Sequence, residues 1–286
     1  MTKELTTQEQ ADFDRKIRAM AGQMVGGSEN FIPKLNVNKN PEDQEGNDIP
    51  VGGFKVKTKN QGTVYSKRKE GIQFRLFAKR YGYVAYDSKG GADGKGATVA
   101  RSVLLPDFNK GSEYISDDGS LKAGKANPKT PTTRVSCKIE FFGLATFDGV
   151  SPKGEPIRVE NEPMRFTIGG KPFLSVDGYL KDFGKDGRLF FDYMLTVTPV
   201  HKGEGFYNIE LQFTDLTNKL EFGEEGFKTL QTFYDYIEAN NKAIEVKFNQ
   251  ALKNKPTAED SVGADIVENA PLEDDFAEDE EEHEED

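Results

Sequence analysis

Apolar and polar residues alternate over much of the middle of the chain, which is the pattern of half-buried β-strands. Residues 72–78 show this alternation most clearly. We expect 81–86 to return beside 72–78 as a hairpin that turns at Arg80, and 206–213 to pair with 189–197. The full set of strands predicted by this pattern is 53–59, 72–78, 81–86, 98–105, 135–147, 157–168 (interrupted at Pro163), 189–197 and 206–213.

Three segments have the apolar spacing of helices instead, with one stripe of large side chains every three or four residues. They cover 6–25, 172–183 and 224–253. Pro172 suits the first turn of the second helix, because the missing N–H would have no partner there. The side chains expected to face inward are, in chain order, Phe13, Ile17, Met20 and Met24; Phe173, Val176, Leu180 and Phe183; and Phe227, Leu230, Tyr234 and Ile237.

These elements predict a mainly β fold with flanking helices, in the α+β class. Turn-rich segments at 36–53 and 107–134 predict long surface loops. The body is long enough to bury a core of its own. The chain divides into an N-terminal helical arm at 1–27, a β-rich body at 28–255 with its C-terminal helix at about 224–253, and a disordered tail at 256–286.

Charge separates the tail from the body. The chain has 38 basic and 49 acidic residues, for a formal net charge of −11. Fifteen of the carboxylates, and none of the lysines or arginines, lie in 256–286. The rest of the chain therefore carries 38 basic and 34 acidic residues, a net charge of +4. A basic body with an acidic tail is typical of a protein that handles a polyanion and carries its own competitor.

Residues suited to catalysis or metal binding are sparse. Cys137 is the only cysteine, which excludes an internal disulfide and a multi-cysteine zinc site, and we expect it to be a small buried strand residue. His283 lies in the tail, so His201 is alone in the body and no catalytic pair can be argued. Residues 88–97 lack P-loop spacing, and 182–193 lack two calcium ligands. We expect no enzyme, no cofactor and no metal.

No apolar run follows the basic residues near the N-terminus, so a signal peptide is not expected. No stretch reaches the roughly twenty apolar residues of a membrane span. The sequence therefore predicts a cytoplasmic protein without a membrane partner.

Positive charge is concentrated in 54–101, where twelve basic residues and three acidic ones give a net charge of +9. Aromatic residues are interleaved with them, and alternation puts Phe77 on one face with Arg75 and Lys79. Aromatic rings stack on unpaired bases at about 1–3 kcal/mol per base, while basic side chains neutralise phosphates. Because these residues lie on predicted strands and loops, not on a recognition helix, the pattern favours single-stranded nucleic acid.

We expect Phe77, Tyr81 and Tyr83 to stack bases and the basic residues to contact phosphates. The alternative is an ordinary solvated sheet face. The full set of candidate nucleic-acid contacts is Lys57, Lys59, Lys67, Arg68, Lys69, Arg75, Phe77, Lys79, Arg80, Tyr81, Tyr83 and Arg101.

This plan resembles the single-stranded-DNA-binding proteins of bacteriophages. The resemblance covers the basic strands from about 54 to 213 and the tail, with its sequence PLEDDFAEDEEEHEED. It implies an OB-like core, a five-stranded barrel with a basic aromatic groove, and a function in coating single-stranded DNA during phage DNA replication, recombination and repair. It also implies that the tail competes with DNA and recruits polymerase and helicase-primase. The tail residues expected to bind such partners are Leu272, Asp274, Asp275, Phe276, Glu278 and Asp279.

Several alternatives stay open at the level of sequence. The core can be a β-sandwich, and the arm can dock on a neighbouring protomer to give a homo-oligomer. The tail ends in Asp286, whereas some members of the family end in an aromatic residue. Two other functions are a virion structural or assembly protein of β class and an acidic DNA mimic that binds a protein partner. The sequence does not separate DNA from RNA, because no pattern in it reports recognition of a 2′-hydroxyl.

Overall fold

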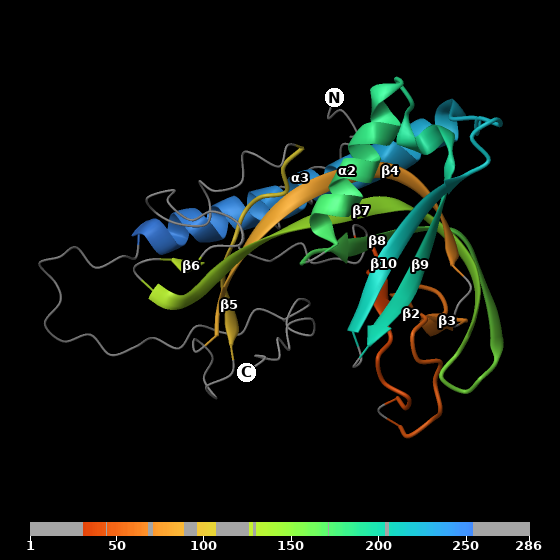
Figure 1. Cartoon of the computed structure of the whole chain (residues 1–286), viewed down its shortest axis with the longest axis horizontal. Coiled ribbons are helices and arrows are strands. Elements are labelled where there is room, and N and C mark those ends of the chain that lie inside the picture. Colours follow the sequence, from red (N-terminus) through yellow and green to blue (C-terminus); the bar gives the residue numbers. More distant parts are fainter. Residues whose placement is uncertain are drawn as a thin grey trace, which may run out of the picture. The chain divides into compact units, whose positions relative to one another are not determined.

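The computed structural model describes residues 31–43, 45–67, 71–88, 96–106, 126–127, 130–170, 172–203 and 206–253. The N-terminal helix and the acidic tail predicted from the sequence lie outside these ranges. The described residues form one antiparallel sheet with two α-helices (Figure 1), which confirms the mainly β, α+β class. The elements are β1 Asn36–Val37, β2 Phe54–Thr58, β3 Gly62–Ser66, β4 Ile72–Asp87, β5 Ala97–Arg101, β6 Ala126–Asn127, β7 Thr130–Val150, β8 Pro156–Ile168, α2 Phe173–Lys185, η4 Phe190–Asp192 (a 3₁₀ turn), β9 Met194–Gly203, β10 Phe206–Thr214 and α3 Gly223–Lys253.

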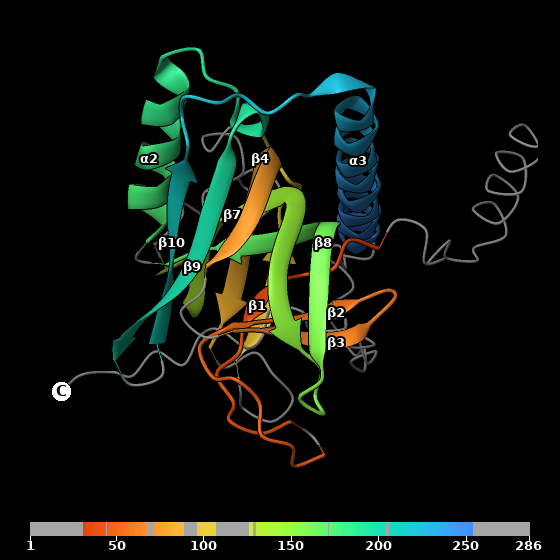
Figure 2. The same ribbon diagram turned by 90° about the vertical axis from the view of Figure 1, so that its right-hand side faces the viewer.

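Two long strands, β4 and β7, form the centre of the sheet, and each pairs with different strands at its two ends. The sheet order is β1-β2-β3-β7-β4-β9-β10, with β5 beside β4 and with β6 and β8 beside β7. Figure 2 shows β10, β9 and β4 side by side. This sheet is not closed, because no backbone pairing among the described strands joins β10 to β1. Side chains do connect these ends: a Cβ added to Gly52, just before β2, would lie 2.8 Å from the ring of Tyr207 on β10.

The predicted hairpin turn at Arg80 is wrong, because β4 runs without a break from Ile72 to Asp87. A β-bulge replaces the turn. The pairing of β4 with β7 shifts between Leu76 and Ala78, which leaves Phe77 as the extra residue. An inserted residue reverses which face the following side chains occupy. Sequence alternation does not reveal it, since the strand is apolar on both faces at this point.

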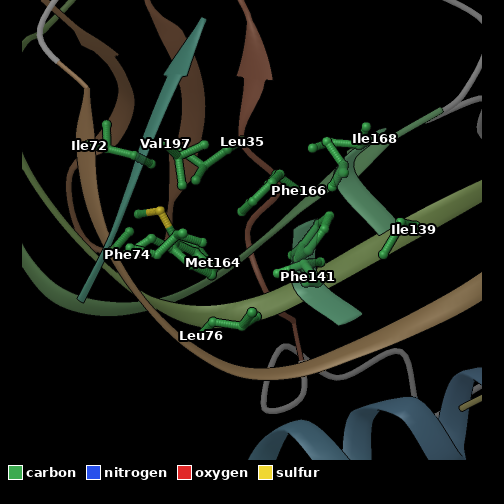
Figure 3. Packing of buried hydrophobic residues seen from close by; sticks show 14 of the residues in the cluster. Leu35, Ile72, Phe74, Leu76, Ile139, Phe141, Met164, Phe166, Ile168 and Val197 are labelled. Atoms are coloured by element: carbon green, nitrogen blue, oxygen red, sulfur yellow. The ribbon is translucent and has the colours of Figure 1, made fainter. Parts of the chain in front are cut away.

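The main hydrophobic core lies on one face of the sheet, under α2. Phe166 stacks on Phe141 with ring centroids 4.6 Å apart and meets Phe74 edge to face at 5.0 Å. The four residues of α2 predicted to face inward are all buried, which confirms that helix. Figure 3 shows part of this core, formed by Leu35, Ile72, Phe74, Leu76, Ile139, Phe141, Met164, Phe166, Ile168 and Val197.

A second cluster lies on the opposite face, under α3. Its centre is Phe233, fully buried, and Ile237, 3% exposed. The inward face predicted for this helix is therefore wrong in part: Phe227 is 61% exposed and Tyr234 is 47% exposed. Leu230 and Ile237 belong to both the predicted and the observed inward face. Aromatic residues lie on several sides of α3, so the spacing rule is also satisfied when Phe233 replaces Tyr234.

Other elements also differ from the sequence prediction: β3 was not predicted, and the strand expected at 98–105 is β5, which ends at Arg101. β7 begins at Thr130, so the end of the predicted loop 107–134 is strand. β9 begins at Met194, because the preceding residues form η4. β8 continues through Pro163, and it can do so because its outer edge requires no ladder bond from that residue. Among the described helices, none combines the length and apolar character needed to cross a bilayer.

Candidate nucleic-acid interface

The most basic exposed element is the β2–β3 hairpin, residues 54–67, which we call the lysine hairpin. Its first strand alternates strictly: Phe54 and Val56 are buried, while Lys55 and Lys57 are exposed. The exposed side chains of Lys59, in the turn, and of Lys67, after β3, continue this set. No acidic residue occurs in 54–67. The hairpin therefore presents four cations, and one strand carries two of them on the same face.

The lysine hairpin is fixed to the body at its open end. The backbone N–H of Phe54 donates to the Oγ of Ser66 at 2.7 Å. A Cβ at Gly53 would lie 2.2 Å from the carbonyl oxygen of Ser66, so only glycine allows this approach. Tyr65 pairs with Val150 at the end of β7. These contacts hold the lysines on a rigid base.

An aromatic pair lies near the start of the hairpin. His201 on β9 and Tyr207 on β10 face each other across the ladder, with ring centroids 5.0 Å apart. His201 is exposed, Tyr207 is partly buried, and Tyr207 lies against Gly52. From the sequence, His201 was considered only as an isolated histidine without a catalytic partner, and Tyr207 was not singled out. Because both residues flank one short turn between predicted strands, pairing across that turn could have identified them from the sequence.

The three aromatic residues expected to stack bases are buried instead. Phe77, Tyr81 and Tyr83 are 5%, 2% and 6% exposed. Phe77 packs in the second cluster, with the rings of Phe222 and Phe233 centred about 6 Å away. A buried ring offers no face to a base, so we assign no stacking to these three residues.

The basic residues of β4 make internal contacts. The bulge puts Arg75 and Lys79 on opposite faces. Arg75 donates to the carbonyl oxygens of Phe191 at 2.8 Å and Glu221 at 2.7 Å, which ties β4 to the chain before α3. Arg80 donates to the carbonyl oxygen of Lys79 at 2.8 Å. These guanidinium groups have structural roles in this conformation.

Lys79 belongs to a polar cluster under α2. Its Nζ lies 3.6 Å from Oδ1 of Asp177 and 2.7 Å from the hydroxyl of Tyr81, which itself donates a short hydrogen bond to Asp177. Lys181 lies 2.6 Å from the other oxygen of Asp177. Burial lowers the pKa of Lys79, and the negative charge of Asp177 opposes that shift. The cluster attaches α2 to β4.

Arg101 lines a hollow between the sheet and the C-terminal half of α3, which we call the α3 hollow. Lys138 and Arg165, from β7 and β8, line the same space, and the sequence analysis named neither as a candidate contact. Arg165 could have been singled out from the sequence, because it is a charged residue within the mostly apolar strand segment PMRFTI. Arg68 and Lys69, like the tail residues from Leu272 to Asp279, lie outside the described ranges.

Cys137 lies in β7 and is buried, as expected from the sequence. Burial raises the pKa of its thiol to about 12, against a smaller opposing contribution from a hydrogen bond with Tyr83. It is therefore a packing residue and not a nucleophile at neutral pH. Within the described ranges, no three His, Cys, Asp or Glu side chains gather as a metal site.

Comparison with known proteins adds no relative: no family model, no curated protein and no solved structure matches this chain. The case for a function rests on the chain's own charge distribution and geometry.

Proposed function

We propose that this protein binds and coats single-stranded DNA, as in phage DNA replication, recombination and repair, and that its acidic tail competes with the DNA. The observation that carries the proposal is the division of charge: the tail holds fifteen carboxylates without a basic residue, and the body is net positive. Such a body attracts a polyanion, and such a tail is its natural competitor.

The lysine hairpin is the proposed phosphate-binding strip, through Lys57, Lys59 and Lys67 of the original candidates, together with Lys55. Exposed residues two apart on β2 are about 6.6 Å apart, given a rise of about 3.3 Å per residue. Their flexible ammonium groups follow a backbone without reading its sequence, because phosphate contacts carry no base information. Counterion release would make this binding depend steeply on salt.

Tyr207 and His201 are the proposed base-stacking residues, in place of the buried rings of Phe77, Tyr81 and Tyr83. The ring of Tyr207 lies beside Gly52, three residues before the first lysine of the strip, and the ring of His201 contacts that of Tyr207. Stacking tolerates any base, because every base has a π-face. The combination of stacking rings and lysines favours single strands, whose bases are not already stacked in a duplex.

The finer architecture, an OB-like barrel, belongs to the same proposal. In its favour, the two ends of the open sheet order approach each other through the side chain of Tyr207 at Gly52. At rest the tail would lie over the lysine hairpin, since exposed opposite charges attract within a Debye length of about 8 Å. DNA would release it for replication proteins such as polymerase or helicase-primase, with Leu272 and Phe276 as apolar anchors.

The test is fluorescence anisotropy of a labelled oligo-dT across a series of salt concentrations, using the full chain and a variant carrying Lys55→Gln, Lys57→Gln and Lys59→Gln. For single strands, each lost phosphate contact lowers the slope of log K against log salt by about 0.7. The triple variant should therefore bind more weakly, with a slope smaller by about 2.

The matched control removes three lysines that are paired with carboxylates elsewhere: Lys202→Gln, Lys219→Gln and Lys228→Gln. The control should keep the slope of the original protein. If both variants lost the same affinity and the same amount of salt slope, net charge alone would attract the DNA, and the proposed strip would be rejected.

A further inference from the structure

The α3 hollow has a volume of about 230 Å³ and lies on the face of the sheet covered by α3. Glycines create part of this space. Gly82 on β4 pairs with Lys138 on β7, and on the other side of Lys138 a Cβ added to Gly169 would lie 3.0 Å from its side chain. With no side chain on either neighbour, the Lys138 stem occupies a shallow trough across three strands.

The lining of the hollow is cationic. Its described lining residues include three cations, Arg101, Lys138 and Arg165, and one carboxylate, Glu140. Glu140 is already engaged, because its Oε1 accepts a hydrogen bond from Nη1 of Arg165 at 2.6 Å and both side chains are buried. Its charge is thus largely balanced inside the lining.

A threonine hydroxyl in the lining has no hydrogen-bond partner among the described residues. The Oγ1 of Thr167 is buried, and it lies on β8 directly opposite Glu140. A buried hydroxyl without a hydrogen bond costs free energy, about 1–3 kcal/mol, unless a ligand or water completes it. This atom is therefore placed to meet a ligand that enters the hollow.

The helix covering the hollow is attached at a defined point. The side-chain oxygen of Asn241 accepts from the N–H of Leu104 at 2.7 Å, and its amide nitrogen donates to the carbonyl oxygen of Leu104 at 2.9 Å. Tyr236, Asn240 and Ile244 of α3 then form the roof. The guanidinium of Arg165 lies 5.7 Å from the centre of the Tyr236 ring, which holds both in place.

We propose that the α3 hollow is a phosphate-binding site, with Lys138 and Thr167 as its principal contacts and Arg101 as a further cation of its lining. The volume is below the range of about 300–1,000 Å³ that holds a drug-sized ligand. It suits a phosphate group with at most its attached sugar. Lysine, arginine and threonine are common phosphate contacts in proteins. The site does not require that the lysine hairpin bind DNA.

The phosphate can come from two sources, a free phosphate or nucleotide and the phosphodiester of a strand. Isothermal titration calorimetry of the full chain at constant low ionic strength would use inorganic phosphate, thymidine monophosphate and oligo-dT as separate probes. The variants are Thr167→Val, which keeps the side-chain shape, and Lys138→Gln. The control is Lys242→Gln, which removes an exposed lysine of α3 that does not line the hollow.

Thr167→Val and Lys138→Gln should each weaken at least one probe about tenfold, while Lys242→Gln leaves all three unchanged. Weaker binding of inorganic phosphate and thymidine monophosphate identifies a free phosphate or monoester as the ligand. Weaker binding of oligo-dT alone identifies a phosphodiester. The site is refuted if both variants have the melting temperature of the original chain and bind all three probes with its affinity. The triple lysine variant separates the two proposals, because it should lose oligo-dT but keep inorganic phosphate.

Discussion

The lysine hairpin and the α3 hollow are both basic, but they are built in different ways. The hairpin takes its four lysines from fourteen consecutive residues, 54–67, and two of them, Lys55 and Lys57, are exposed by simple alternation along β2. The hollow takes its cations from three separate parts of the chain, at residues 101, 138 and 165, and buries one of them against a carboxylate. A flat exposed strip suits a long polymer, whereas a covered space suits one small anionic group.

This difference also explains what the sequence could reveal. Strict alternation identified β2 and its lysines, and the helical spacing of Phe173, Val176, Leu180 and Phe183 identified α2 together with its buried face. Alternation failed on β4, because a single bulged residue, Phe77, reverses the faces and separates Arg75 from Lys79. The α3 hollow could not be predicted, since it depends on which strands are neighbours across long sequence separations.

The same limit applies to the stacking residues. Phe77, Tyr81 and Tyr83 were chosen because they lie among basic residues in the sequence. Both faces of β4 are covered, one by α2 and the other by α3, so aromatic residues on this strand become core. Tyr207 and His201 are far from the basic segment in sequence and come near it through the packing of β10 against Gly52.

The largest expected effect concerns the helix that covers the hollow. Phe233→Ala removes a fully buried ring and should lower the free energy of unfolding by about 3–5 kcal/mol. Phe227→Ala is the matched control on the same helix, and its ring is 61% exposed, so it should change stability by less than about 0.5 kcal/mol. Urea denaturation measures both. Similar losses in the two variants would contradict the inward face assigned to α3.

A second pair of variants sharpens the contrast between exposed and buried rings. Tyr207→Leu should weaken oligo-dT binding by about 1–3 kcal/mol, the usual contribution of one stacked base, with little loss of stability. Phe77→Leu should do the reverse, because that ring is only 5% exposed: the protein loses stability and keeps its affinity. Anisotropy and thermal melting on the same samples separate the two. Unchanged affinity in Tyr207→Leu would remove stacking from this site.

The smallest expected effect concerns Asp177, which pairs with the partly buried Lys79 under α2. Burial alone would raise the pKa of Asp177, but hydrogen bonds from Lys181 and Tyr81 and the nearby lysine charges hold it below its ordinary value. A lowered pKa adds stability above the unfolded-state value of about 3.9, and that stability disappears as pH falls through the folded-state pKa.

Asp177→Asn should therefore be less stable than the original protein at pH 7, by about 1 kcal/mol. Their urea midpoints should approach each other as the pH falls below about 3.9. A difference in urea midpoint that stays constant across this pH range would show that the ionisation of Asp177 does not contribute to stability. Lys55 and Lys57, which are exposed on β2, serve as controls: replacing either by Gln should leave this pH profile unchanged.

The most direct test of the account compares oligo-dT binding by the full chain and by a form that ends at Lys255, at low and at moderate salt. Removing the tail deletes fifteen carboxylates and leaves α3 intact. We predict tighter binding by the shorter form, and an affinity that falls steeply with salt. Absence of binding by both forms would contradict the account, and the lysine hairpin would then be an ordinary solvated surface.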